Sequence, residues 1–285
     1  MKAVIKSFLY GEEKDLIQFP QHYIGVSFKD FIRSKYPDKI ISFIIHFVVG
    51  MELYFKEKIS LFDEKIIYGK YNKDFFDSLR HSQDKKQYII NSLDNLKIGD
   101  KAIQLQSSIT LFKALYKIDD KRLDNMYEFK DIRDNLFHKN ITIDSFDTTK
   151  KYIDTLLWLY EFNTTLLDNN DWLLSAIQLG DPRGENHKNL LELTKYYDNP
   201  IDFYIQKNIF KSAVEYQDYY FIDSRVKERI VRKCDKFIHD SCPACHSKKL
   251  GKTDDLIICH ICHFTVTKKE FDKSLFFKDY DYDKL

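Results

Sequence analysis

The chain has 285 residues, of which 44% are hydrophobic and 31% charged, with only 8 Gly and 5 Pro. So few chain breakers favour long helices over a turn-rich β architecture, and we expect a mostly α fold. Lys and Arg (45) nearly balance Asp and Glu (44), so the overall charge gives no reason to expect a polyanionic partner, and only a local basic face could provide one.

The longest apolar run is Ile40–Met51, which His46 interrupts. It falls well short of the roughly 20 residues needed to cross a bilayer, so it predicts a buried helix. The N-terminal sequence lacks the apolar stretch of a signal peptide, and we therefore expect a cytoplasmic protein that makes no membrane contact. In the cytosol, the five cysteines indicate metal ligands or free thiols rather than disulfides.

Helical periodicity begins after residues 1–36, an N-terminal segment that the sequence leaves unassigned. A helix is expected from Pro37, which suits a first turn, to about Ser60. This helix is apolar nearly all round, which places it inside a bundle. Its polar residues His46 and Glu52 are expected to form hydrogen bonds within the core, and they rank second as site candidates.

The next stretch, residues 61–95, is a polar and aromatic mixture that predicts one or two short helices, with a surface turn at Asp77–His81. Residues 99–117 carry apolar side chains at helical spacing and predict a second bundle helix. A third helix starts after a cap at Asp119 or Asp120. Its apolar positions form one stripe, which consists of Leu123, Met126, Phe129, Ile132 and Leu136.

The third helix is expected to stop near Asn140, and a fourth, capped by Ser145 or Asp147, continues to about Leu167. Helices joined by short links suggest a bundle. Residues 37–168 are therefore assigned to one helical domain.

Residues 169–239 are expected to form a separate helical linker region that ends in a basic helix, Ser224–His239. This helix is either an ordinary solvated face or a surface that follows a phosphate backbone, and the sequence does not decide between them. Its candidate nucleic-acid-binding residues are Arg225, Arg229, Arg232 and Lys233.

The C-terminal segment, residues 240–285, contains two Cys-x-x-Cys turns separated by thirteen residues. Each turn can direct two thiolates at one tetrahedral centre, and four sulfurs close the coordination sphere, so a bound Zn²⁺ would be structural. The expected ligands are Cys242, Cys245, Cys259 and Cys262. The alternative is two unrelated pairs of reduced thiols. The spacing fits a hairpin that turns at Lys249–Gly251, and the segment resembles the zinc ribbons of cytosolic nucleic-acid enzymes, with a strand expected from Phe264.

One short motif in the third helix has the residue types of an acid–base site, namely Arg133 and His138. On a helix they lie about 7.5 Å apart along the axis and on different faces, so they converge only if the helix ends between them or a second copy faces the first. Asp134 and His138 can touch, which would favour the imidazolium and fix its orientation. The guanidinium of Arg133 offers a fork of donors that fits a phosphate.

Residues 37–167 resemble a HEPN domain, a helical family whose members often carry an Arg, a polar residue, three variable residues and a His as a ribonuclease motif. The segment Arg133–His138 matches that pattern residue by residue. Met51–Lys56 is similar to the first-helix signature of the family, and the extended Ile141–Asp144 fits the segment before the last helix.

The resemblance implies an endoribonuclease that needs no metal for catalysis and forms a homodimer in which two motifs line one cleft. The ribose 2′-hydroxyl would attack the adjacent phosphate and leave a cyclic phosphate and a 5′-hydroxyl. His138 would act as general base or acid, Arg133 would bind the scissile phosphate of the RNA, and Asp134 or Asn135 would orient the pair. Such nucleases are common as toxins and in defence against phage, where an inhibitory or activating protein partner is expected.

In the alternative interpretation, Arg133 is an ordinary surface arginine, and His138 is a histidine that interacts favourably with the C-terminal end of the helix dipole. On that view the chain is a non-catalytic adaptor, in which the bundle is a dimerisation scaffold and the zinc ribbon with Ser224–His239 binds nucleic acid or protein. The two hypotheses differ in their product, because only the nuclease leaves a cyclic phosphate.

Overall fold

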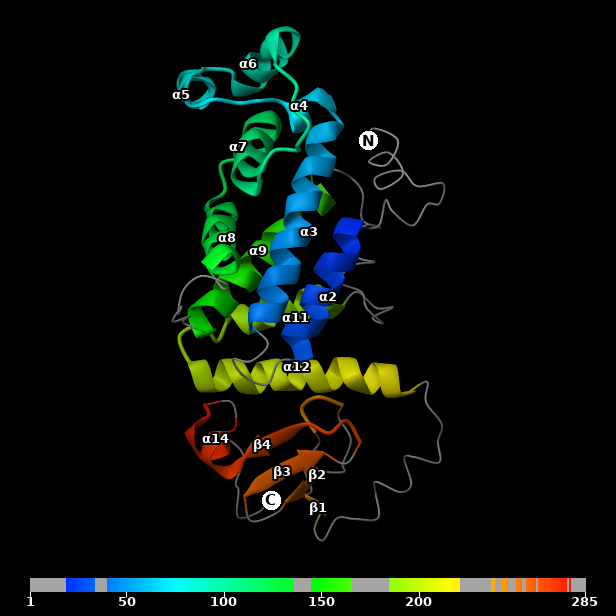
Figure 1. Ribbon diagram of the computed structural model, residues 1–285. Coiled ribbons are helices and arrows are strands. Elements are labelled where there is room, and N and C mark those ends of the chain that lie inside the picture. Colours follow the sequence, from blue (N-terminus) through cyan, green and yellow to red (C-terminus); the bar gives the residue numbers. More distant parts are fainter. Residues whose placement is uncertain are drawn as a thin grey trace. The chain divides into compact units, whose positions relative to one another are not determined.

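The computed structural model (Figure 1) confirms a mostly α fold with a small antiparallel sheet near the C-terminus. The chain divides into two compact units: the first contains Met1–Phe28 and Ile40–Ile143, and the second contains Lys29–Lys39 and Asp144–Leu285. The residues that the structure describes are 19–33, 40–135, 145–165, 185–220, 237–238, 242–245, 250–252, 255–259, 261–275 and 277.

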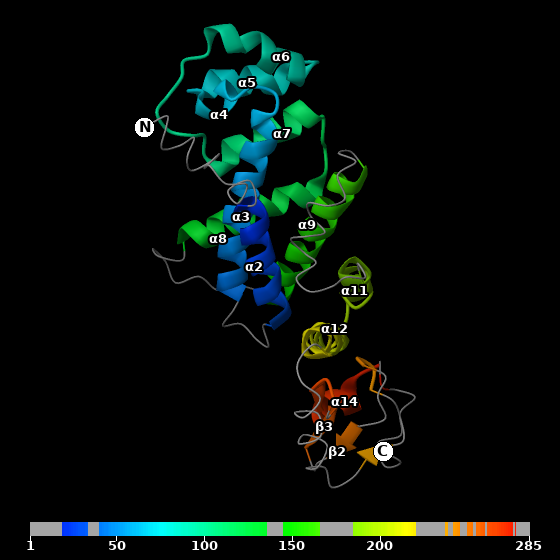
Figure 2. The same cartoon turned by 90° about the vertical axis from the view of Figure 1, so that its right-hand side faces the viewer.

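Helix α3 is the central element of the first unit, with α7 and α8 packed along it. Figures 1 and 2 show α4, α5 and α6 gathered near the C-terminal end of α3. The ring centroid of Phe55 on α3 lies 4.9 Å from the ring centroid of Phe112 on α7. The helices of this unit are α2 (Phe19–Arg33) as far as Phe28, α3 (Ile40–Ser60), α4 (Lys65–Tyr68), α5 (Lys73–His81), α6 (Lys85–Ser92), α7 (Leu105–Tyr116) and α8 (Asn125–Asn135), with 3-10 turns η3 (Leu93–Asn95) and η4 (Lys121–Asp124).

Helix α2 occupies part of the N-terminal segment that the sequence left unassigned, and it passes very close to α3 at Gly50. A β-carbon at Gly50 would lie 2.8 Å from Cγ1 of Ile24, so only glycine allows this approach. The hydroxyl of Ser27 donates a hydrogen bond of 2.7 Å to the carbonyl oxygen of Phe43 at the same crossing. The two helices are therefore joined by close packing and by a buried polar contact.

Residues 61–95 form three short α-helices, α4, α5 and α6, where one or two were expected. The predicted surface turn at Asp77–His81 is wrong, because these residues lie within α5. The side chain of Asn72 accepts a hydrogen bond from the amide of Phe75 and caps this helix. Leu79, which is 2% exposed, then packs inward. The helix forms because one strong cap and one buried apolar residue offset a polar composition.

The third predicted helix is confirmed as η4 followed by α8. Asp120 caps it by accepting a hydrogen bond from the amide of Arg122. The predicted stripe is buried as far as the structure describes it, at Leu123, Met126, Phe129 and Ile132. Leu136 and the helix end expected near Asn140 lie outside the described residues.

The second unit contains α9 (Ser145–Thr165), α11 (Glu185–Thr194) and α12 (Pro200–Tyr220). Helix α9 confirms the fourth predicted helix from Ser145 as far as Thr165, and the end expected near Leu167 lies outside the described residues. The helix falls in this unit rather than with α3. The hydroxyl of Tyr197 donates a hydrogen bond of 2.8 Å to Asp154 of α9, which ties the turn between α11 and α12 to α9. Pro200 suits the first turn of α12 because a proline there loses no helical hydrogen bond. The domain boundaries predicted after residues 36, 168 and 239 do not coincide with the limits of the two compact units, and they stay predictions.

The C-terminal sheet has the strand order β1-β2-β3-β4, and all neighbouring strands are antiparallel. Ile205 and Ile209 of α12, one helical turn apart, belong to the apolar core of this sheet. The buried carboxylate of Asp202 accepts hydrogen bonds from the Ser274 hydroxyl and the Leu275 amide. The strands are β1 (Phe237–Ile238), β2 (Leu250–Lys252), β3 (Leu256–Cys259) and β4 (Thr265–Thr267), and helix α14 (Lys268–Lys273) follows.

Two local predictions in this region are wrong. Leu250 and Gly251 do not form the hairpin turn; they lie in β2 and pair with Cys259 and Ile258, because Leu250 is buried in the sheet core. Phe237 and Ile238 were predicted to lie at the end of the basic helix, but they form strand β1. The strand expected from Phe264 is confirmed as β4. No helix among the described residues is long and apolar enough to cross a membrane.

Candidate functional site

Arg133, in the last described turn of α8, is held by carboxylates from two helices. Its Nη1 lies 3.2 Å from Oε2 of Glu52 on α3, and its Nε lies 2.9 Å from Oδ1 of Asp134. Glu52 also pairs with Lys56 at 2.6 Å, one turn further along α3. These two ion pairs fix the orientation of the guanidinium. The Arg133 side chain is 25% exposed and therefore still reaches solvent.

Asp134 is paired with cations on both sides, because Lys130 lies 2.7 Å from its Oδ2 and Arg133 from its Oδ1. The hydrogen bond from Lys130 and that from Arg133 hold the pKa of the Asp134 carboxyl below its ordinary value. Asp134 is therefore ionised at neutral pH. The amide of Asn135 donates a hydrogen bond of 2.8 Å to the carbonyl oxygen of Asp131, so this predicted site residue binds its own helix.

His138 lies outside the described residues, and so does the expected contact between Asp134 and His138. Another histidine of the predicted bundle, His46, stacks on Tyr23 with ring centroids 6.2 Å apart. Glu52 forms hydrogen bonds as expected, but its side chain is 22% exposed and its partners are Arg133 and Lys56 rather than groups in the core.

The four predicted zinc ligands come together at the end of β3 and the turn before β2. Their sulfur atoms all lie within 4.8 Å of one another, with Cys242 and Cys262 separated by 3.5 Å and Cys245 and Cys259 by 3.6 Å. Tetrahedral Zn²⁺ with bonds of about 2.3 Å places its sulfur ligands about 3.8 Å apart. The four thiols therefore fit Zn²⁺, and three of them are buried.

The backbone around the second Cys-x-x-Cys turn has the geometry of a metal-binding loop. His263 adopts the left-handed conformation with φ 58°, its amide donates to the carbonyl of Cys259 at 2.9 Å, and the Cys259 amide donates to Phe264 at 2.8 Å. Hydrogen bonds among the four thiols lower the pKa of Cys259 and raise the pKa of Cys242 and of Cys262, so this network by itself favours a thiolate at Cys259. Because four sulfurs close the site, it can stabilise structure but offers no open position for substrate.

The candidate nucleic-acid-binding residues of the basic segment lie outside the described part of the chain; they are Arg225, Arg229, Arg232 and Lys233. Lys56 and Lys130 pair with the two carboxylates around Arg133, and neither lysine was predicted as a site residue. The signal that could have found them was local, because Glu52 with Lys56 and Lys130 with Asp134 each stand four residues apart on one helix.

No model of a known protein family, no curated protein and no solved structure matches the chain. The resemblance to HEPN ribonucleases therefore rests on the amino-acid sequence alone. What the structure adds is the setting of Arg133 and the grouping of the four cysteines.

Proposed function

We propose that the protein is a metal-independent endoribonuclease of the HEPN type, in which Arg133 binds the scissile phosphate and His138 transfers protons. The observation that carries this proposal is the setting of Arg133, whose guanidinium is oriented by Glu52 and Asp134 and partly exposed. Carboxylates that fix a guanidinium in place leave its remaining N–H donors aimed in one direction, as a phosphate-binding group requires.

In the proposed reaction the ribose 2′-oxygen attacks the adjacent phosphorus while His138 accepts the 2′-hydroxyl proton. The bond from phosphorus to the 5′-oxygen breaks, and the leaving oxygen takes a proton from a second imidazolium. The products are a cyclic phosphate and a 5′-hydroxyl. Side chains supply the base, the acid and the charge on the phosphate, so no catalytic metal enters the proposal.

The second imidazolium is proposed to be His138 of another copy, with the two motifs lining one cleft of a homodimer. The zinc ribbon has a structural role in this scheme, because its closed four-sulfur site stabilises the second unit. The basic segment before the ribbon would bind RNA or an inhibitory or activating protein. A role as a toxin or in defence against phage is the setting that the family resemblance suggests.

A second candidate function is a non-catalytic adaptor. The observation that favours it is that two carboxylates already pair with Arg133 and occupy some of its N–H donors, which leaves fewer donors for a phosphate. An adaptor would bind nucleic acid through the basic segment with strong salt dependence, and charge reversal at Arg229 and Arg232 would abolish binding.

The decisive experiment is a gel of mixed RNAs incubated with the wild type and with His138→Ala, in buffer without divalent ions and with a chelator. Zinc content and circular dichroism are measured on the same samples, so that loss of activity through removal of structural zinc is recognised. The matched control is His81→Ala, because His81 is an exposed histidine of α5 in the same unit.

We expect RNA fragments with cyclic phosphate ends from the wild type and from His81→Ala, and none from a folded His138→Ala. Cleavage that needs added Mg²⁺, or that survives His138→Ala, would overturn the nuclease. Salt-sensitive binding without any cleavage product would favour the adaptor.

A further inference from the structure

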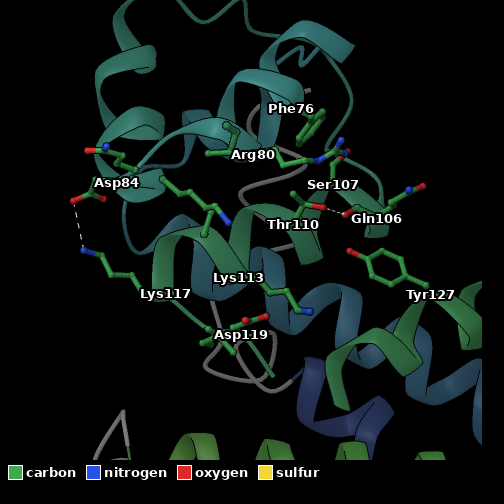
Figure 3. A pocket seen from close by; sticks show the side chains of 15 residues that line it. Phe76, Arg80, Asp84, Gln106, Ser107, Thr110, Lys113, Lys117, Asp119 and Tyr127 are labelled. Carbon is green, nitrogen blue, oxygen red and sulfur yellow. Dashed lines mark hydrogen bonds and ion pairs between the residues drawn. The ribbon is translucent and has the colours of Figure 1, made fainter. Parts of the chain in front are cut away.

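The first unit contains a pocket of about 820 Å³ that the motif does not explain. Figure 3 shows side chains from α5 and α7, together with Tyr127 from the start of α8, facing this hollow. Lys85, the first residue of α6, also lines it. Four cations and two carboxylates line it, whereas the whole chain is nearly neutral. These charged residues are Arg80, Lys85, Lys113, Lys117, Asp84 and Asp119.

Several polar groups of the pocket are available to a ligand. Gln83, Lys85, Ser107 and Tyr127 make no side-chain hydrogen bond, ion pair or ring contact with any other described residue. In contrast, Lys113 is held by Asp124 at 2.7 Å. The pocket thus offers an ammonium group, an amide, a hydroxyl and a phenol that no other described side chain uses.

This set of groups matches the parts of a nucleotide. The partly buried ring of Tyr127 lines the pocket and can stack on a base, the amide of Gln83 can bond to a base edge, and the ammonium of Lys85 can pair with a phosphate. In Figure 3 the phenol oxygen of Tyr127 points toward Gln106 and Thr110, so its ring stands at the wall of the pocket. A purely apolar ligand would leave these polar groups desolvated and unpaired.

The pocket is also connected with Arg133 along α8. Tyr127 and Arg133 lie on the same helix, about 9 Å apart along its axis. Lys130 stands one turn after Tyr127 and contacts Asp134, which in turn contacts Arg133. Lys130 and Asp134 therefore lie on α8 between the pocket residue Tyr127 and the proposed phosphate-binding arginine.

We infer that this pocket binds a nucleotide of single-stranded RNA next to the scissile phosphate, with Tyr127 stacking on its base and Lys85 contacting its phosphate. The choice of RNA rests on the proposed function, whereas the nucleotide chemistry rests on the pocket. Because stacking and phosphate contacts ignore base identity, the pocket confers a preference for unpaired RNA rather than for one sequence.

The test measures binding separately from cleavage, using a fluorescent 2′-O-methyl oligoribonucleotide that lacks the attacking hydroxyl. Anisotropy is recorded for the wild type, Lys85→Glu, Tyr127→Ala and Tyr127→Phe. The control is Lys73→Glu, an exposed lysine of α5 outside the pocket. Lys85 is the first residue of α6, where a glutamate favours the helix dipole, so Lys85→Glu is expected to fold. Circular dichroism checks each variant.

We expect Lys85→Glu and Tyr127→Ala each to weaken binding by roughly tenfold or more, and Lys85→Glu also to reduce the salt dependence. Tyr127→Phe keeps the ring and should retain binding, and Lys73→Glu should change it less than twofold. Unchanged binding in folded Lys85→Glu and Tyr127→Ala, or no binding by the wild type, would overturn the pocket proposal. A free nucleoside monophosphate that binds more tightly than the oligonucleotide would overturn the assignment to RNA.

Failure of this inference and failure of the nuclease are distinguishable. If the wild type cleaves no RNA but the pocket variants bind the oligonucleotide more weakly than the wild type, the nucleotide site stands and only the catalytic proposal fails. If the wild type cleaves RNA and both pocket variants cleave it at the same rate, the pocket proposal fails and the nuclease proposal stands.

Discussion

Arg133 and Glu52 are 81 residues apart in the sequence, yet their side chains form an ion pair of 3.2 Å between α8 and α3. This contact joins the segment that resembles a first-helix signature to the segment that carries the Arg and His motif. Glu52 does not touch a substrate in our proposal; it positions the guanidinium. Its removal should therefore change activity more than stability.

We predict that Glu52→Gln lowers the kcat/KM of RNA cleavage by roughly tenfold to a hundredfold, because a small misplacement of Arg133 weakens its contact with the phosphate. The free energy of unfolding should change by less than about 1 kcal/mol, since partly exposed ion pairs contribute little. Urea unfolding and initial cleavage rates measure the two effects. Glu64→Gln, an exposed glutamate of the same unit, is the control. Equal activity of both variants would show that Glu52 does not position Arg133.

Sequence periodicity was sufficient where burial alone decides the structure. The stripe from Leu123 to Ile132 predicted a helix and its buried face, and four cysteines at matched spacing predicted the cluster. The same reasoning failed at Gly251, where a residue typical of turns lies in a strand because its neighbour Leu250 is buried. Local preference loses to tertiary packing at such positions.

The pair formed by Glu52 and Arg133 could not be predicted, because its geometry depends on how two helices distant in the sequence pack together. The pocket lined by Lys85 and Tyr127 has the same origin, since its walls come from separate short helices. A periodicity argument assigns residues to faces of one element. It carries no information on which polar residues of different elements meet.

The four-cysteine cluster predicts one zinc ion per chain, measured by atomic emission. Cys259→Ser should lose the metal, whereas His263→Asn should keep it, because asparagine tolerates the left-handed φ of this residue and the imidazole is no ligand in our assignment. Loss of zinc from His263→Asn would show that the histidine belongs to the ligand set.

Removal of zinc should also loosen α12, because Ile205 and Ile209 share the core of the ribbon. Structural Zn²⁺ stabilises zinc-finger peptides by about 10 kcal/mol, so chelation should unfold the sheet and expose these residues. Hydrogen exchange of the α12 amides reports the change. Unchanged protection of α12 after complete loss of zinc would contradict the coupling.

At the crossing of α2 and α3 we predict that Gly50→Ala destabilises the protein by about 1 to 3 kcal/mol, because the new methyl group overlaps Ile24. Alanine would otherwise favour a helix by about 1 kcal/mol, so the sign of the effect is diagnostic. Gly99→Ala is the matched control, since its β-carbon would meet chiefly the flexible side chain of Lys70. A stabilising Gly50→Ala, measured by urea unfolding, would contradict the close approach of the two helices.

Lys207 of α12 is 6% exposed, and its ammonium lies 4.9 Å from the ring centre of Phe31. Burial, and secondarily the charge of Lys211, lowers its pKa to about 7 from an ordinary value of 10.5. Between these two values the unfolded chain holds a proton that the folded chain has released. Stability should therefore rise with pH across this window, and the full cost of burying the charge is present below about pH 7.

Lys207→Met removes the titrating group and keeps an unbranched apolar stem. We expect the variant to be more stable than the wild type by roughly 1 to 4 kcal/mol at neutral pH, with the difference shrinking as the pH rises to about 10. Urea unfolding of both proteins across that range gives the difference, in which the titration of all other groups cancels. Lys188→Met, an exposed lysine of α11, should show no such trend. A stability difference for Lys207→Met that is independent of pH would mean that the lysine stays charged in the folded protein and that its ammonium finds compensation where it is buried.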